Sequence, residues 1–336
     1  MYFDIAMPLT LFAVTVTAMF LSGKIEKKLK ITFEEKELGI RDVVILIAMI
    51  SLAVSIVVFI PQIAVMSVFL FVYSMLLFVF TYIFSSFQKK TAMVLCAFFA
   101  IASILIATIS FFIFGSYGMV AYGALAFYCL CLFSLIALLY EKRRTNIKER
   151  WYLAVLPSAV FIILYIFYNQ TPLWFPYLLN TYGAVFAVLV ILYLGSLFTW
   201  RTTLVFSALL TGVDVFLVLV TRAMISAATH VSELRLPVLI TLQTIPAIMT
   251  PSGFLCMSLG LGDFFFSGLI AVQTLKKFGK NFALLSAVAM ATSFFIFETL
   301  ILNFEVSAFP GTLMIICGWL PLLAFKFLRE KITRQP

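Results

Sequence analysis

The stretch "SLGLGDFFFSG", residues 258–268, places Asp263 between a Gly-Leu-Gly segment and a run of phenylalanines. A carboxylate with almost no polar neighbours in the sequence is costly to bury, so its presence needs an explanation. The rest of the chain is equally apolar: of its 336 residues, 64% are hydrophobic and 11% are charged. About a quarter of the residues of a typical soluble protein are charged. With a mean hydropathy of +1.16, the chain is predicted to form one compact membrane domain.

Eleven apolar runs have lengths close to the ~20 residues that cross a bilayer. The sequence therefore predicts an all-α polytopic membrane protein with about 9–11 transmembrane helices. The segment 223–251 contains three prolines, and its apolar piece "LPVLITLQTIP" is too short and proline-cut to be a further span, so a strand or a re-entrant piece is expected there. The predicted spans are 3–22, 43–60, 62–87, 91–114, 116–140, 151–168, 174–199, 203–221, 252–273, 281–303 and 307–328.

The distribution of positive charge predicts the orientation of these spans. Of the 23 lysines and arginines, all except Arg222 and Arg235 fall in every second connection or in the C-terminal tail. Basic loops stay on the cytoplasmic side, so we expect the N-terminus outside and the C-terminus in the cytoplasm. The net charge of +9 thus reflects membrane topology, and no nucleic-acid partner is expected.

Residue composition excludes several kinds of chemistry. The five cysteines are an odd number and all lie in apolar runs, which is typical of small core residues. His230 is the only histidine, and no Gly-x-Ser-x-Gly element accompanies it. We therefore expect no metal, no cofactor and no serine-histidine nucleophile.

Three acids lie well inside predicted spans: Asp214, Asp263 and, nearer an outer end, Glu298. A carboxylate at mid-bilayer costs about 2.5–3.5 kcal/mol on insertion scales. Asp214 and Asp263 are each the twelfth residue of consecutive, antiparallel runs, so we expect them at the same depth. If both runs are helices, each aspartate shares one helix face with small and polar residues. For Asp214 these are Ser207, Thr211 and Thr221. For Asp263 they are Ser252, Cys256, Gly260 and Ser267.

Two carboxylates that face each other in a membrane cannot both ionise cheaply, so such a pair can share one proton. One of them can then take a proton from water while the other donates one to a scissile carbonyl, which is the chemistry of an aspartic protease. Gly260 and Gly262 leave room beside Asp263 for a substrate backbone. The structural alternative is a pair of acids that only form hydrogen bonds between helices.

At these residues the chain resembles the presenilin and signal peptide peptidase family of intramembrane aspartyl proteases, and its short loops resemble the archaeal members. The family's Gly-x-Gly-Asp motif is matched by residues 260–263, and "FFFSGLIA" resembles its apolar continuation. The family's Tyr-Asp motif is matched in part, because Val213 precedes Asp214. The resemblance covers about residues 200–328, and the predicted orientation is that of signal peptide peptidases.

The family's third motif, Pro-Ala-Leu, has its counterpart in Pro310, Gly311 and Thr312, where only the proline is kept. Pro321 lies deeper in its span and is a poorer counterpart. The resemblance implies that Asp214 and Asp263 are catalytic. It also implies that Gly260, Gly262 and residues 310–312 bind substrate.

The resemblance divides the chain into two parts. Residues 1–200 would form a scaffold that gates substrate, and residues 201–336 would carry the catalytic helices. The substrates would be transmembrane proteins or signal peptides within the bilayer, which is the cell membrane if the source is prokaryotic. Residues 238–243, just before the Asp263 helix, are expected to pair with an unwound substrate as an added strand.

Two other functions remain open at this point. A proton-coupled transporter could use Asp214 and Asp263 as a relay, although no inverted repeat is visible. A scaffold or insertion factor could use them only structurally. Prepilin peptidases share the Gly-x-Gly-Asp motif, but they usually carry a lysine soon after the aspartate.

Overall fold

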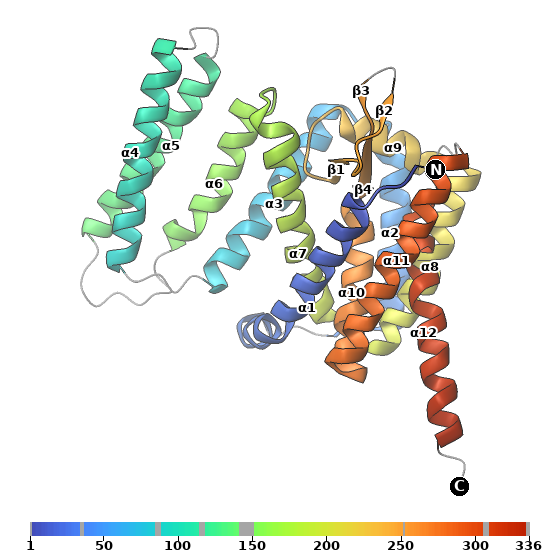
Figure 1. Ribbon diagram of the computed structural model, residues 1–336. Coiled ribbons are helices and arrows are strands. Elements are labelled where there is room, and N and C mark those ends of the chain that lie inside the picture. Colours follow the sequence, from blue (N-terminus) through green and yellow to red (C-terminus); the bar gives the residue numbers. More distant parts are fainter. Residues whose placement is uncertain are drawn as a thin grey trace. The chain divides into compact units, whose positions relative to one another are not determined.

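The computed structural model describes residues 2–33, 37–84, 89–113, 118–140, 151–250, 253–304 and 309–333 (Figure 1). The prediction of one compact domain is wrong, because the chain folds as two compact units, one formed by Met1–Val65 with Leu179–Pro336 and the other by Met66–Leu178. The division of roles at residue 200 rests on motifs rather than on packing, and it stays a prediction.

The first unit carries both aspartates and all the strands. Its elements are α1 (Ala6–Phe33), α2 (Ile40–Val57), α7 (Leu179–Leu197), α8 (Trp200–Val215), the π-helical turn η3 (Phe216–Val220), α9 (Ala223–Ser232), β1 (Leu239–Gln243), β2 (Met249–Thr250), β3 (Gly253–Phe254), β4 (Cys256–Gly260), α10 (Leu261–Phe278), α11 (Lys280–Phe304) and α12 (Gly311–Thr333).

The second unit is built from helices, and aromatic side chains fill part of its interior. Trp174 is fully buried and lies edge-on to Tyr165, with 5.5 Å between the ring centroids. Ser158 Oγ donates a hydrogen bond of 2.6 Å to the carbonyl of Ser74, which ties two of the helices together. The elements are α3 (Gln62–Phe84), α4 (Lys89–Ile113), α5 (Gly118–Tyr140), α6 (Trp151–Tyr168) and the π-helical segment η2 (Leu173–Leu178).

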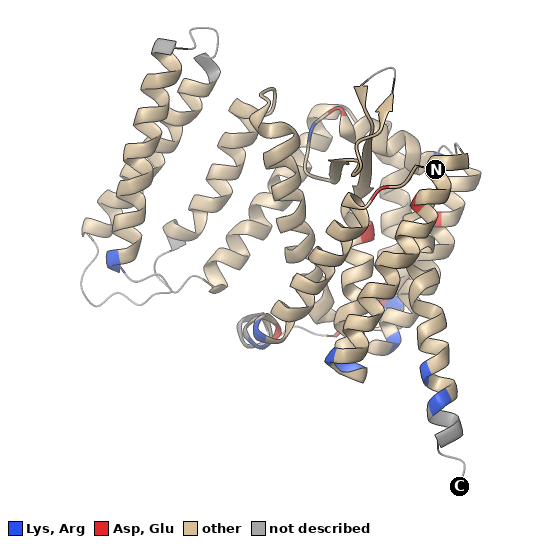
Figure 2. Ribbon diagram, in the orientation of Figure 1, with Lys and Arg blue, Asp and Glu red and all other residues tan. Residues whose placement is uncertain are grey.

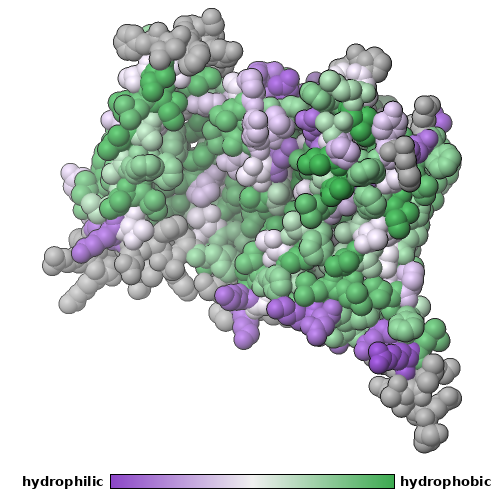
Figure 3. All heavy atoms as spheres, in the orientation of Figure 1, coloured by the Kyte–Doolittle hydropathy of each residue, from purple (hydrophilic) through white to green (hydrophobic). Residues whose placement is uncertain are grey.

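The chain is an all-α polytopic membrane protein, as the sequence predicts. In the described part of the chain, nine helices are long and apolar enough to cross a membrane. Figure 3 shows that the visible helix surfaces are largely hydrophobic, as expected for helices that face lipid and not water. The apolar part of α6, Tyr152–Tyr168, is shorter, and α10 is not among the nine. An acid in the first turn of α10 and two lysines in its last turn make that helix more polar.

Positive charges of the first unit gather at one end of its helices. In Figure 2, lysine and arginine residues lie at the ends of α1, α10 and α12 that are remote from the strands. Two of these lysines, Lys276 and Lys277, are in the last turn of α10. This arrangement is what the positive-inside rule expects of a cytoplasmic side, so the predicted orientation fits the fold.

Helix α10 lies at the centre of the first unit and contacts α1, α7, α8, α11 and α12. Polar side chains fix it in place. Ser267 Oγ lies 2.8 Å from Thr15 Oγ1 of α1. Gln273 Nε2 donates hydrogen bonds to the carbonyls of Gly195 (3.0 Å) and Phe198 (2.8 Å), at the end of α7. These contacts hold α10 against α1 and against the end of α7.

The prediction of a helix over 252–273 is wrong in its first half, because α10 begins only at Leu261. Cys256 and Gly260 belong to β4, so they share no helical face with Asp263. These residues instead form a strand, β4, whose backbone pairs with the antiparallel strand β1. A short apolar run cannot be assigned to helix or strand by periodicity alone, which explains the error. A strand in 223–251 was expected and is present as β1, whereas α9 was not expected.

The β1–β4 pair is fixed by contacts at both ends. Ile240 of β1 is buried and packs so closely on Gly183 of α7 that a Cβ at Gly183 would lie 2.9 Å from Ile240 Cγ1. Asp4 is fully buried, and its Oδ1 accepts a hydrogen bond of 2.7 Å from the backbone N–H of Ile245, just after β1. The same carboxylate accepts hydrogen bonds from the first turn of α1. These contacts hold the strands beside the start of α10.

Gly318 of α12 lies directly against the backbone of α11. A Cβ at this position would overlap the carbonyl oxygen of Ala289 and would lie 2.8 Å from Ser293 Cβ. We expect Gly318→Ala to destabilise the protein by about 1–3 kcal/mol, because backbone cannot move away as a side chain can. The matched control is Gly212→Ala, since a Cβ there would meet nothing within 4 Å. Thermal unfolding of the purified variants tests this, and equal melting temperatures would contradict it.

Candidate functional site

One pocket of the first unit contains both aspartates. It has a volume of about 300 Å³ and is built by α8, η3, α9, β1, β4, α10, α11 and α12. Only four of its lining side chains are polar, and these are Asp214, Ser258, Asp263 and Glu298. The pocket is therefore an apolar chamber in which acids are the main polar groups, an arrangement typical of catalytic and binding sites.

Asp214 is the penultimate residue of α8 and is buried, with 8% of its surface exposed. Its Oδ2 accepts two hydrogen bonds from Thr312, one from the hydroxyl (2.6 Å) and one from the backbone N–H (3.3 Å). The backbone N–H is free to do this because Thr312 lies in the first turn of α12, where helical N–H groups have no partner in the helix. The start of α12 thus fixes the orientation of one carboxylate.

Asp263 lies in the first turn of α10 and is half-buried. Gly260 is the N-cap of the helix and lies beside this carboxylate, because a Cβ at Gly260 would be 3.5 Å from Asp263 Oδ2. The partial positive charge of a helix N-terminus also favours an acid there. The same carboxylate that interrupts the apolar run therefore starts the helix that follows it.

Gly311 lies directly against Asp263. A Cβ at Gly311 would be 2.5 Å from Asp263 Oδ1 and 2.6 Å from its Cγ. An alanine, which the family motif has at this position, would require the carboxylate to move. Because Gly311 contacts Asp263 and its neighbour Thr312 binds Asp214, the two carboxylates lie next to each other, and the charge of Asp214 acts on Asp263.

The aspartates come together by a different route from the one that the sequence predicts. Asp263 is the third residue of α10 and so does not lie in mid-helix, whereas Asp214 lies in the second half of the helical span Trp200–Val220 that α8 and η3 form together. Both aspartates are the twelfth residue of their apolar runs, but this does not place them at mid-helix, because the first part of the run 252–273 forms β4 and not a helix. The end of an outgoing helix and the start of a returning one lie on the same side, which is what brings the two acids together.

The other predicted site residues divide into two groups. Gly260 and Gly311 line the pocket. Gly262 is exposed and Pro310 is buried, and neither is among the lining residues. Thr312 contacts Asp214 without lining the pocket. The expectation that residues 310–312 lie beside the aspartates agrees with the contacts of Gly311 and Thr312, whereas their binding of substrate stays a prediction.

Residues 238–243 were expected to pair with an unwound substrate, but the edge of β1 is already occupied at Thr241. Asn180 of α7 binds both backbone groups of Thr241 in β1, with Nδ2 donating to the carbonyl (2.6 Å) and Oδ1 accepting from the N–H (2.8 Å). One edge of β1 is thus taken by Asn180 at Thr241, and the other by β4. A substrate strand cannot pair with β1 at Thr241.

The open edge next to the pocket belongs to β4. Thr241 is directly opposite Ser258, and the backbone groups of Thr241 point away from β4 toward Asn180. In an antiparallel pair, opposite residues share this direction, so the N–H and C=O of Ser258 point to the outer edge of β4. No other strand pairs with that edge within the described ranges. Met257, Ser258, Leu259 and Gly260 all line the pocket.

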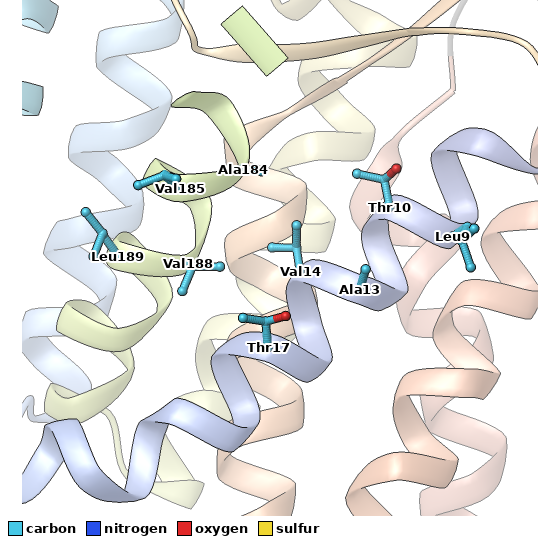
Figure 4. A pocket seen from close by; sticks show the side chains of 9 residues that line it. All are labelled: Leu9, Thr10, Ala13, Val14, Thr17, Ala184, Val185, Val188 and Leu189. Atoms are coloured by element: carbon cyan, nitrogen blue, oxygen red, sulfur yellow. The ribbon is translucent and has the colours of Figure 1, made fainter. Parts of the chain in front are cut away.

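A second hollow, between α1 and α7, lacks these features. It has a volume of about 540 Å³, and none of its nine lining residues is acidic (Figure 4). Its only polar side chains are the hydroxyls of Thr10 and Thr17. The chemistry-bearing residues therefore select the pocket of Asp214 and Asp263 as the candidate site. Among the residues that the structure describes, no three His, Cys, Asp or Glu side chains are grouped so that they could hold a metal ion.

Sequence reasoning missed two features of this site. It grouped Thr312 with the substrate-binding residues, whereas the structure shows it as the partner of Asp214. It noted Glu298 as an acid inside a span without giving it a role, and Glu298 lines the same pocket as the aspartates. Its isolation on an apolar helix was the available signal.

No protein-family model matches the chain, and no curated protein has significant sequence similarity to it.

Proposed function

We propose that this protein is an intramembrane aspartyl endopeptidase of the presenilin and signal peptide peptidase type. The observation that carries the proposal is one pocket that combines Asp214, Asp263 and the open edge of β4. A pair of acids supplies proton transfer, and a strand edge supplies backbone partners for an extended peptide. The motifs at 260–263 and 310–312 support the same activity.

The proposed reaction is hydrolysis of a peptide bond by a water held between the aspartates. One carboxylate takes a proton from the water, whose oxygen adds to the carbonyl carbon. The other aspartate, in its protonated form, donates its proton to the carbonyl oxygen. The C–N bond then breaks, the amine leaves with the proton held by the pair, and a carboxylic acid forms as one hydroxyl on the tetrahedral carbon returns its proton to the pair. The pair returns to one shared proton, and no further reactant is consumed.

The proposed substrates are transmembrane segments or signal peptides, which reach the pocket from the bilayer. A helix hides its peptide bonds within its own hydrogen bonds, so the segment to be cut must unwind. Its freed backbone groups then need partners, because each unsatisfied group in lipid costs several kcal/mol. We propose that the outer edge of β4 provides them at Ser258. In a prokaryote, this reaction would take place in the cell membrane.

Incubation of the purified protein with a model transmembrane peptide tests the proposal. We expect mass spectrometry to detect two fragments whose masses add up to that of the peptide plus one water. A peptide that stays intact in detergent and in liposomes would contradict the proposal.

Thr312 is expected to act as a positioning residue for Asp214. Thr312→Val removes the hydroxyl donor and keeps the shape and the backbone N–H, so kcat should fall about 10-fold or more. Because Thr312 does not line the pocket, KM for the peptide should change little. Thr312→Ser should restore kcat, since it returns the hydroxyl. A loss that serine does not rescue would contradict the assignment.

A proton-coupled transporter is the second candidate, and the presence of a third acid, Glu298, in the pocket favours it. Such a protein would acidify or alkalinise liposomes when a solute gradient is applied, and it would cleave no peptide. A strand edge beside the acids has no evident use in a transporter, so the protease is the preferred function.

A further inference from the structure

Glu298 is a third acid of the pocket, and it has no partner in the described part of the molecule. It lies on α11 and is almost fully buried, with 1% of its surface exposed. Its Oε2 is buried and makes no hydrogen bond, although Glu298 lines the pocket. Buried polar groups in proteins are nearly always hydrogen-bonded, so each exception calls for an explanation.

The surroundings of Glu298 do not supply that partner. Phe294 and Ile301, which are one helical turn away on either side, line the pocket together with Glu298. Asp4, whose charge acts on Glu298, is an acceptor and not a donor. Its two oxygens already accept hydrogen bonds from the backbone N–H groups of Ala6, Met7 and Ile245. The pocket-lining neighbours of Glu298 on α11 are therefore apolar and supply no hydrogen-bond donor.

We propose that Glu298 forms a substrate subsite that takes a side chain able to donate a hydrogen bond. This inference rests on the proposed protease function, since it names a preference of the same pocket. A purely apolar wall would bind any apolar side chain of a transmembrane substrate. An unpartnered carboxyl instead favours binding of a side chain with a hydroxyl or an ammonium group. A site built to hydrogen-bond a substrate group discriminates against substrates that lack it.

Two substrate side chains carry this chemistry, and they differ in what they require of Glu298. A serine hydroxyl can donate to a carboxylate and can also pair with a neutral carboxyl or an amide. A lysine ammonium is stabilised by an ionised carboxylate and gains much less from an amide. The two sources can therefore be separated by comparing Glu298→Gln with Glu298→Leu.

The test uses a transmembrane peptide that the wild-type protein cleaves. At each position near the scissile bond, one residue is made Leu, Ser or Lys in turn, and kcat/KM is measured. At one position we expect wild type to prefer Ser or Lys over Leu by about 10-fold or more. Glu298→Leu should bring this ratio close to one. Glu298→Gln should keep a preference for Ser and lose a preference for Lys.

Two controls separate this role from a structural one. Thr292→Leu changes an exposed residue of the same helix and should keep the wild-type ratios. Glu298→Leu should melt no lower than wild type, because it removes an unpartnered acid from apolar surroundings. A much lower melting temperature of Glu298→Leu, together with wild-type ratios for Ser and Lys in that variant, would make Glu298 structural and overturn the proposal.

The remaining outcomes also decide the question. Unchanged ratios in Glu298→Leu would overturn the subsite and leave the protease function in place. If wild type cleaves none of the peptides, both the subsite and the proposed function fail.

Discussion

Replacing Asp263 or Asp214 by asparagine is expected to abolish peptide cleavage. Asparagine keeps the size of the side chain and loses its ability to take up and release a proton. Acid–base catalysis of this kind contributes about 10²–10⁴-fold to a rate, and each aspartate is needed in every turnover. We therefore expect either single variant to lose at least about 1,000-fold in kcat/KM, measured with the model transmembrane peptide. The double variant should be no worse than a single one, because the pair acts as a unit.

The fold of these variants can be checked independently. Asparagine at 214 can still accept hydrogen bonds from Thr312, so Asp214→Asn should keep a melting temperature close to that of wild type. Glu233→Gln is the matched control, because it removes an exposed acid that binds Gln62 outside the pocket. It should keep full activity. Cleavage within 10-fold of wild type by either aspartate variant would reject the catalytic pair.

Ser258→Pro is expected to lose at least about 100-fold in cleavage. Proline removes the backbone N–H of Ser258, which points to the open edge of β4, and its ring occupies the space beside that edge. A substrate strand would then lose one donor in a medium where unsatisfied backbone groups cost several kcal/mol. Pairing of β4 with β1 should persist, because the backbone of Ser258 takes no part in that ladder.

Ser258→Ala is the control for the side chain, since the hydroxyl of Ser258 lies 2.8 Å from that of Thr241. Equal cleavage by the alanine and proline variants would show that substrate does not pair with β4. Proline at Ile240 is a poorer test of strand pairing, because Ile240 is 1% exposed and its replacement would damage the β1–β4 pair itself.

The sequence by itself determined the class of the fold and named the chemistry-bearing residues of the site. Apolar runs of bilayer length have one physical solution, which is helices that satisfy their own backbone. The few acids in those runs are conspicuous because a charge in lipid is costly, so Asp214, Asp263 and Glu298 could be identified from composition alone. The short motif around Pro310 pointed to a segment that does contact both aspartates.

Only the tertiary structure decided how these residues meet. The apolar residues of 256–260 fit a helix and a strand equally well, and pairing with β1 made them β4. That choice moved Asp263 from mid-helix to the first turn of α10, where Gly260 and Gly311, at the start of α12, lie beside its carboxylate. Asn180 likewise closes β1 and leaves β4 open, through a contact between residues 61 positions apart. Such contacts join distant parts of the chain, and local sequence carries no record of them.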